Sequence, residues 1–346
     1  DVAPAPWEEV RAKVEEDLGG PVEKIFASFD TAALAAGSIA QVHRARLKDG
    51  QEVVVKVRRA GLRPLVEADL RLLSHAAGLA EKQWPEFSRY RSREILHRLG
   101  IAMSEELDLA AEGRNCETIS ENLAGMEAIS IPRIFSEWTC ERLLVQEFVD
   151  GIVPTDRESI EAAGLDGRVL AERGATAFLR MALIDGVFHA DPHPGNLAWT
   201  ESGELVVYDF GSVLRLEPRL LAGYVQIFEA LRGSSSEALE PGFQALGGRQ
   251  PGSKPPHGLY RSIHLMLHPL LQPGAQWDFR EAALHQRLSE LFPLMMSALG
   301  SLQPASGTLL INRTLEGHYW NLYRLGACLP IADLLAEHIE RWRSEA

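Results

Sequence analysis

The sequence predicts an α+β fold of two lobes, a small mixed lobe followed by a larger and mostly helical one. Its 346 residues are enough for two domains of average size. Short β-branched segments alternate with helical patterns up to Asp150-Gly151, and helical patterns dominate beyond it. We therefore expect a first domain over residues 1–148 and a second over 149–346.

Composition excludes several classes of protein. The chain carries 35 Lys and Arg against 48 Asp and Glu, a net charge of −13, which argues against a nucleic-acid binder. Its three cysteines show no metal-binding or disulfide spacing, which fits a reducing compartment. The longest apolar stretch, residues 175–188, is interrupted by Arg180 and Asp185 and is too short to span a bilayer. We expect a cytoplasmic protein with at most peripheral membrane contact.

The first domain begins with a helix and a β-hairpin. Apolar residues recur at helical spacing over residues 6–18, and Gly19-Gly20 ends the pattern. Two β-branched segments, 38–47 and 52–58, are joined by Lys48-Asp49-Gly50, a sequence that favours a tight turn. These segments predict a helix followed by a two-stranded hairpin.

Further elements follow from the same periodicities. They are helices over 62–82 and 87–123, strands over 129–135 and 142–149, a helix over 165–186, a loop over 187–197 and a strand over 204–209. Helices dominate from there to the end. The Gly-, Ser- and Pro-rich residues 233–257 predict connectors around one short helix.

The densest chemical motif lies in the second domain. It runs from His189 to Asn196 and includes Asp191, and Asp209-Phe210-Gly211 follows thirteen residues later at the end of an apolar strand. Phosphoryl transfer needs a carboxylate to orient the nucleophile and oxygen ligands for magnesium. Asp191, Asn196 and Asp209 supply these groups at the spacing of a protein-kinase catalytic loop and its metal-binding motif.

Two other interpretations of this loop stay open. His189, Asp191 and His193 stand at alternate positions, where they could present three ligands to a transition metal. The loop could also be a polar turn made rigid by its two prolines. Phosphoryl transfer is favoured because it alone explains Asp209-Phe210-Gly211.

Lys56 is the candidate phosphate-binding residue of the first domain. It is centred in the strand 52–58, where alternation alone predicts that it faces solvent. Its position upstream of Asp191 and Asp209 favours a different interpretation, in which Lys56 is the lysine that binds phosphates in a kinase fold.

Such a lysine needs a carboxylate partner. Asp108 and Glu112 stand one helical turn apart in the predicted helix 87–123, an unfavourable pair of like charges unless a cation approaches. A solvated acidic helix face is the alternative interpretation.

Residues 32–43 lie where a kinase has its glycine-rich phosphate lid, but most of the glycines are alanines. A β-carbon permits less close approach of the backbone to phosphates. The start of a helix rich in small residues is an equally good interpretation of this segment alone.

Together these motifs resemble those of the UbiB (AarF) family of atypical protein-kinase-like proteins, from about Val22 to Leu220. The matching motifs are, in order, the alanine-rich loop Ala35–His43, the strand lysine Lys56, Glu106-Leu107-Asp108 with Glu112 and Asn115, the loop His189–Asn196, and Asp209–Gly211. The family's KxGQ element has no counterpart in residues 1–34, and Gly37 stands where the family has alanine. The charged C-terminal segment 329–346 also differs from the apolar spans of membrane-anchored members.

The resemblance implies a protein-kinase-like fold that binds ATP and Mg²⁺ and hydrolyses ATP rather than phosphorylating proteins. The implied catalytic residues are Asp191, Lys56 and Glu112, and the implied magnesium ligands are Asn196 and Asp209. The implied nucleotide-binding residues are Ala35, Ala36, Gly37, Ser38 and Lys56 in the first domain, with Glu147 and Phe148 in the hinge that meets adenine.

The leading functional hypothesis is therefore an ATP- and magnesium-dependent UbiB-like kinase or ATPase that assists chemistry on an isoprenoid quinone or another lipid. Two alternatives remain: a small-molecule phosphotransferase similar to aminoglycoside and choline kinases, and a nucleotide-binding pseudokinase scaffold for a protein partner. The short segment 212–218 contains no Ala-Pro-Glu platform for a peptide, so protein phosphorylation ranks low.

Overall fold

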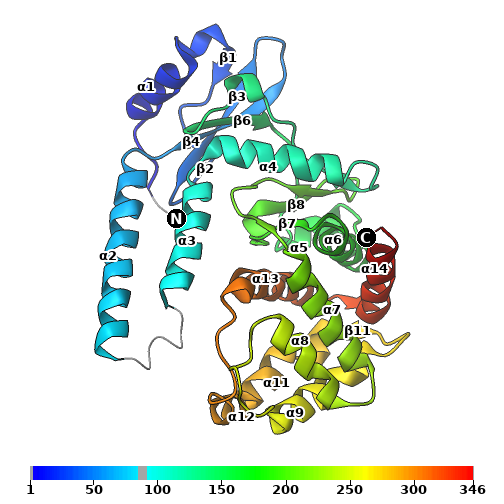
Figure 1. Cartoon of the computed structure of the whole chain (residues 1–346). Helices are drawn as coiled ribbons and strands as arrows, with labels where there is room; N and C mark the ends of the chain where they lie inside the picture. Colours follow the sequence, from blue (N-terminus) through cyan, green and yellow to red (C-terminus); the bar gives the residue numbers. More distant parts are fainter. Residues whose placement is uncertain (1–2, 85–91, 346) are drawn as a thin grey trace. The chain divides into compact units, whose positions relative to one another are not determined.

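A computed structural model describes residues 3–84 and 92–345, which form two compact units (Figure 1). Unit 1 comprises the described residues up to 151 together with 206–213, and unit 2 comprises 152–205 and 214–345. A sheet lies in unit 1 and helices make up most of unit 2, so the predicted α+β class is confirmed. The domain boundary after residue 148 stays a prediction.

The sheet of unit 1 is antiparallel. Its path is β1-β3-β4-β6, and the two-residue strand β2 pairs with β3. The strands are β1 Phe26–Phe29, β2 Ala35–Ala36, β3 Ala40–Leu47, β4 Glu52–Arg58 and β6 Leu143–Glu147. In β4 the valines 53, 55 and 57 are buried on one face, as alternation predicts. Lys56 pairs with Val42 on one side and Leu144 on the other, so it stands in the middle of the sheet.

Helix α1, Trp7–Leu18, forms where the sequence predicts it. Val10 and Val14 bury its apolar face in the same core as the β4 valines. Gly19 ends the helix with a φ of 68°, a left-handed conformation that glycine adopts without strain.

The alanine-rich segment forms a β-hairpin, so the start of a helix is the wrong interpretation. Ala35 pairs with Val42 of β3 and Ala36 pairs with Gln41, and the Gly37 N–H donates to the Ala40 carbonyl at 2.9 Å.

The strand predicted over 129–135 is largely wrong, because β5 covers only Ile129–Ser130.

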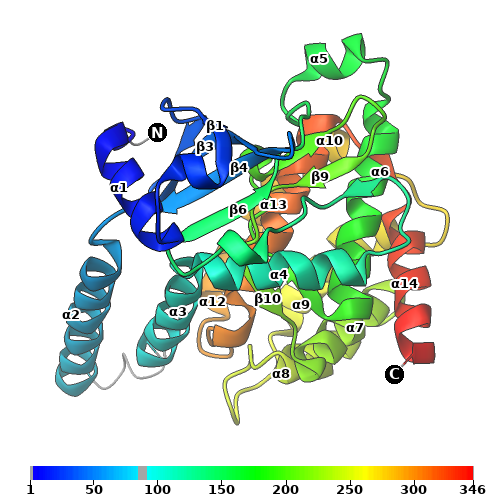
Figure 2. The same cartoon turned by 90° about the horizontal axis from the view of Figure 1, so that it is seen from above.

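The long helix predicted over 87–123 is two helices in the described region. They are α3, Ser92–Glu106, and α4, Leu109–Asn122, and residues 87–91 lie outside the described residues. Asp108 separates the helices because it has an extended backbone and its side chain caps α4 by accepting from the Ala110 N–H at 3.0 Å. Helix α2, Leu62–Gln83, runs beside α3 and away from the sheet (Figure 2).

The large apolar core of unit 2 is formed by side chains from several helices, among them α6, α7, α9, α13 and α14. The bounds of its helices are α5 Arg157–Ala162, α6 Gly167–Leu179, α7 Pro218–Arg232, α8 Leu239–Ala245, α9 His257–Leu267, α10 Phe279–Ala282, α11 Leu284–Glu290, α12 Phe292–Ser297, α13 Leu309–Leu325 and α14 Ile331–Glu345. Its short strands are β7 Val187–His189, β8 Leu197–Trp199, β11 Trp277–Asp278 and β12 Cys328–Leu329. Two further strands, β9 Leu205–Val207 and β10 Val213–Arg215, each have residues in both units. Across 3–84 and 92–345, no helix is both long and apolar enough to cross a membrane.

Candidate active site

Unit 1 brings together three charged side chains that lie far apart in the sequence. The Lys56 Nζ lies 2.8 and 2.9 Å from the two carboxylate oxygens of Glu112, and 2.6 Å from Oδ2 of Asp209. The side chain of Lys56 is 16% exposed and that of Glu112 is 2% exposed, whereas that of Asp209 is 37% exposed. One buried ammonium therefore links a buried carboxylate to one that solvent and ligands can reach.

A close approach of helix to sheet makes this cluster possible. Gly113 follows Glu112 in α4, and a β-carbon at Gly113 would already lie 3.3 Å from the Leu144 side chain of β6. The same helix reaches the Asp-Phe-Gly segment through Asn115, whose side chain donates to the Phe210 carbonyl at 3.2 Å. A bulkier residue at position 113 would push α4, and with it Glu112, away from Lys56.

The electrostatics of the cluster keep Lys56 charged. Burial lowers the pKa of the Lys56 ammonium, but the carboxylates of Asp209 and Glu112 outweigh burial and the net shift is upward. Burial raises the pKa of Glu112 to about 7, the Lys56 ammonium opposes that rise, and the Asp209 charge adds to it. The cluster thus holds one cation against two carboxylates and favours further positive charge, such as a divalent cation.

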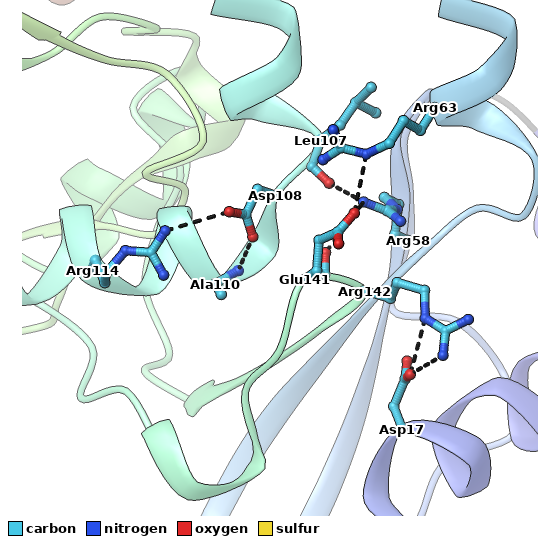
Figure 3. Close-up of polar contacts among 9 residues, drawn as sticks. All are labelled: Asp17, Arg58, Arg63, Leu107, Asp108, Ala110, Arg114, Glu141 and Arg142. Atoms are coloured by element: carbon cyan, nitrogen blue, oxygen red, sulfur yellow. Dashed lines mark hydrogen bonds and ion pairs between the residues drawn. The ribbon is translucent and has the colours of Figure 1, made fainter.

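A second polar network fixes the start of α4 (Figure 3). Arg58, two residues after Lys56 on β4, donates to the Leu107 carbonyl and forms an ion pair with Glu141 at 2.9 Å. Arg63 of α2 pairs with the same Glu141 oxygen at 3.0 Å. Strand β4 therefore contacts α4 through Lys56 and anchors the turn before α4 through Arg58.

The acidic residues around position 108 have separate partners. The Asp108 carboxylate caps α4, and its Oδ2 lies 3.4 Å from Nη2 of Arg114 (Figure 3). Asp108 therefore does not pair with Glu112 on one helix face, as the sequence suggested. Glu106 ends α3, and its Cγ would lie 3.7 Å from a β-carbon built on Gly211. The solvated acidic face is thus the wrong interpretation for Glu112, which is buried against Lys56.

The predicted lid residues Ala35, Ala36, Gly37 and Ser38 form the β2 end of the hairpin. Gly37 does not have a positive φ, and a β-carbon there would meet only the Ala40 carbonyl oxygen at 3.5 Å. An alanine therefore fits at this position without strain. The role of the segment in nucleotide binding stays a prediction.

The predicted hinge residues lie at the end of β6, with Glu147 as its last residue and Phe148 directly after it. The Glu147 carboxylate accepts from the Arg133 N–H at 3.2 Å, and the Phe148 ring lies under the Arg44 guanidinium at 4.1 Å. The preceding residue, Gln146, is 7% exposed and donates to the Tyr208 carbonyl at 3.1 Å, next to Asp209. The contact of Glu147 and Phe148 with adenine stays a prediction.

Unit 2 holds the loop that contains Asp191 and Asn196. The Asn196 side-chain nitrogen donates to the Asp191 carbonyl at 3.1 Å and to its carboxylate at 3.0 Å, which ties the two residues together. The His193 Nδ1 accepts from the Gly195 N–H at 3.0 Å and so shapes the turn. Within the described ranges, no group of three His, Cys, Asp or Glu residues is arranged to hold a metal, so the three-ligand interpretation of this loop finds no support in the structure.

The donor set fits magnesium better than a transition metal. Mg²⁺ prefers carboxylate and carbonyl oxygens. The two Asp209 oxygens accept from the Gly211 N–H and from Lys56, and a carboxylate has further lone pairs with which to bind a cation. Asn196 uses its amide nitrogen in the loop, which leaves the carbonyl oxygen as the atom suited to a hard cation. The residues present therefore fit the predicted ion.

A separate groove of about 920 Å³ lies on unit 1 between α2, α3 and the first turns of α4. Its lining includes Arg63, Asp108 and Arg114, but not Lys56, Glu112 or Asp209. The charged cluster and this groove are therefore different features of the unit.

Sequence reasoning missed three residues that shape the site. Gly113 gave no signal, because a glycine inside a helix has many explanations. Gln146 precedes the predicted hinge but belongs to no motif. Arg58 stands two residues after Lys56 in the same strand, so the two side chains share one face of the sheet. This spacing could have indicated that Arg58 lies near the site.

Comparison with known proteins assigns the family. The model of the ABC1 atypical kinase-like domain matches residues 1–240. The Probable protein kinase UbiB of Aliivibrio salmonicida is 40% identical over 197 residues, which cover 57% of this chain and 36% of that protein. The UbiB protein of Marinobacter nauticus is 39% identical over 221 residues, covering 63% and 40% respectively.

A protein of Synechocystis, sll1770, is 40% identical over 214 residues, 61% of this chain and 36% of its own length. The matched regions thus span well under half the length of these relatives. The structure of Rv3197 from Mycobacterium tuberculosis, solved as a complex with erythromycin, superposes with a TM-score of 0.72 at 22% identity, over 97% of this chain and 83% of that one. That likeness supports the fold, and the family match covers more than half of the chain. The chain therefore belongs to the ABC1 atypical kinase-like family, as its motifs indicated.

Proposed function

We propose that the chain binds ATP with Mg²⁺ and hydrolyses it or transfers its terminal phosphoryl group. The observation that carries the proposal is the Lys56 ammonium, buried between Glu112 and the more exposed Asp209. A buried lysine with two carboxylates is an expensive arrangement for stability alone. It suits a site that binds phosphates through the ammonium and a divalent cation through Asp209.

The roles follow from the chemistry of each group. Lys56 binds phosphate oxygens, and Glu112 holds the ammonium in place. Asp209 and Asn196 would hold a magnesium ion, which would supply positive charge to the phosphates when bound. Asp191 orients the attacking hydroxyl group or water and accepts its proton. When water attacks, its oxygen forms a bond to the terminal phosphorus, the bond to the bridging oxygen breaks, and ADP leaves with the electron pair.

The proposed physiological role follows the family resemblance. We infer that the activity assists the biosynthesis or handling of an isoprenoid quinone or another lipid, and two of the relatives above bear the name UbiB. Phosphate release with and without phospholipid vesicles containing a long-chain quinone tests this role. Stimulation by quinone-containing vesicles over plain vesicles supports it, and equal rates contradict it.

The test of the enzymatic proposal uses Asp209→Asn. The wild type should gain thermal stability with ATP and Mg²⁺ and should release phosphate. The variant should lose phosphate release because the neutral amide lacks the negative charge with which the Asp209 carboxylate would bind Mg²⁺. Asp69→Asn is the matched control, since Asp69 is exposed on α2. Absence of stabilisation at millimolar nucleotide would defeat the proposal.

Two alternatives are separated by the same measurements. Nucleotide binding without turnover favours a pseudokinase scaffold. The family match does not favour the phosphotransferase similar to aminoglycoside kinases. Phosphorylation of a small aminoglycoside or choline acceptor would restore that alternative.

A further inference from the structure

Helix α13 of unit 2 packs against the loop that contains Asp191. The Thr314 hydroxyl, fully buried, donates to the Ala190 carbonyl at 3.0 Å. One turn later, a β-carbon at Gly317 would lie 2.5 Å from the Pro192 ring, so only glycine fits against the loop. A further turn on, the buried Asn321 side chain donates to the Pro192 carbonyl at 2.6 Å.

These three residues recur at a spacing of three and four, so they form one face of the helix. Each contacts the backbone or ring of a residue next to Asp191. The face therefore fixes where the loop lies relative to α13, and it fixes which other α13 side chains lie beside Asp191.

The side chain so placed is Arg313. Its Nη2 lies 3.8 Å from Oδ1 of Asp191, and the side chain is 71% exposed. An ion pair this long and this exposed contributes little to stability. The loop from His189 to Asn196 contains no lysine or arginine of its own, so Arg313 brings a permanent positive charge to it.

We propose that Arg313 is a phosphate-binding residue that contacts the terminal phosphoryl group of the bound nucleotide. The inference rests on the proposed function. A guanidinium presents its donors in a planar fork that matches phosphate oxygens. Beside Asp191 it offsets the repulsion between that carboxylate and the phosphoryl oxygens and stabilises charge that develops on them during transfer. Residue 313 lies outside the family match of residues 1–240, so the match does not assign this role.

The test compares two nucleotides by isothermal titration calorimetry in the presence of Mg²⁺. One is ADP, and the other is the ATP analogue with an imido group between the β- and γ-phosphorus atoms. Arg313→Ala should weaken binding of the analogue about tenfold or more, the effect of losing a charge-assisted hydrogen bond. Its affinity for ADP should stay unchanged, because ADP lacks the terminal phosphoryl group.

Two further variants make the comparison specific. Arg313→Lys keeps the charge without the fork and should recover part of the affinity for the analogue. Arg324→Ala removes the same charge from an exposed position on α13 and should bind both nucleotides as the wild type does. Equal weakening of both nucleotides by Arg313→Ala, or no weakening of either, would overturn the inference while leaving the proposed function intact. A wild type that binds neither nucleotide overturns the proposed function and this inference with it.

Discussion

Replacing Glu112 by glutamine should raise the free energy of unfolding at pH 8. Burial raises the pKa of Glu112 to about 7 from an ordinary 4.5, so the folded state disfavours its ionised form. This rise in the pKa corresponds to roughly 3 kcal/mol of destabilisation once Glu112 is ionised at pH 8. The attraction of the Lys56 ammonium is already included in this raised pKa, so glutamine removes a net cost of ionisation.

The pH dependence of stability tests this cost of ionisation. Because the folded pKa lies above the unfolded one, the folded state binds more protons between about pH 4.5 and 7, and the wild type loses stability as the pH rises through that window. Glu112→Gln lacks this loss, so from pH 5 to pH 8 it should gain roughly 2 kcal/mol relative to the wild type. Nucleotide turnover should nevertheless fall, because Lys56 is left paired with Asp209 alone.

Urea unfolding at both pH values, without metal or nucleotide, measures the stability difference. Glu121→Gln is the control, since Glu121 is exposed on the same helix and should follow the wild type. A variant that is destabilised at pH 8 would refute the reasoning, since the ion pair would then be stabilising. Wild-type turnover in the variant would refute the role of Glu112 in holding Lys56.

Three other predictions concern single positions. Gly37→Ala should raise the free energy of unfolding by about 0.4 to 1 kcal/mol in thermal melts, because the position has no positive φ and room beside Ala40; a loss of stability would contradict this. Burial lowers the pKa of His318 to about 3, and the charge of His189 lowers it further in the same direction. Because the folded pKa lies below the unfolded value of 6.5, the protein loses stability as the pH falls below 6.5. His318→Phe should therefore remove about 2 kcal/mol of acid destabilisation between pH 8 and 5 in urea titrations, and an unchanged pH profile would refute it. Gly317→Ala should clash with the loop and lower the free energy of unfolding by about 1 to 3 kcal/mol, which thermal melts show as a lower melting temperature. A melting temperature equal to that of the wild type would contradict the close approach.

The structure brings Lys56, Glu112 and Asp209 together, but sequence patterns did not predict what surrounds them. Alternation along β4 predicted the buried valines, but the same rule placed Lys56 in solvent. Burial of Lys56 comes from α4, which contacts β6 and brings Glu112 to the lysine. Alternation describes one strand, whereas a covering helix is a tertiary contact that no strand pattern contains.

The predicted elements were wrong where the intrinsic preference of the residues differs from the backbone pairing that they make in the fold. Alanine favours helix, yet Ala35 and Ala36 form a strand because β3 offers backbone partners. The break between α3 and α4 did have a signal, since Asp108 before an apolar residue is a typical helix cap. Arg313 had none, because it belongs to no motif and lies more than a hundred residues from Asp191.

The central claim is that Lys56 and Asp209 act on a nucleotide and its metal ion. A crystal structure with the non-hydrolysable ATP analogue and Mg²⁺ tests it most directly. We predict the Lys56 Nζ within about 3 Å of a phosphate oxygen and the metal ion bound to the Asp209 carboxylate. An analogue bound away from Lys56, with the lysine still paired to Asp209, would contradict the account.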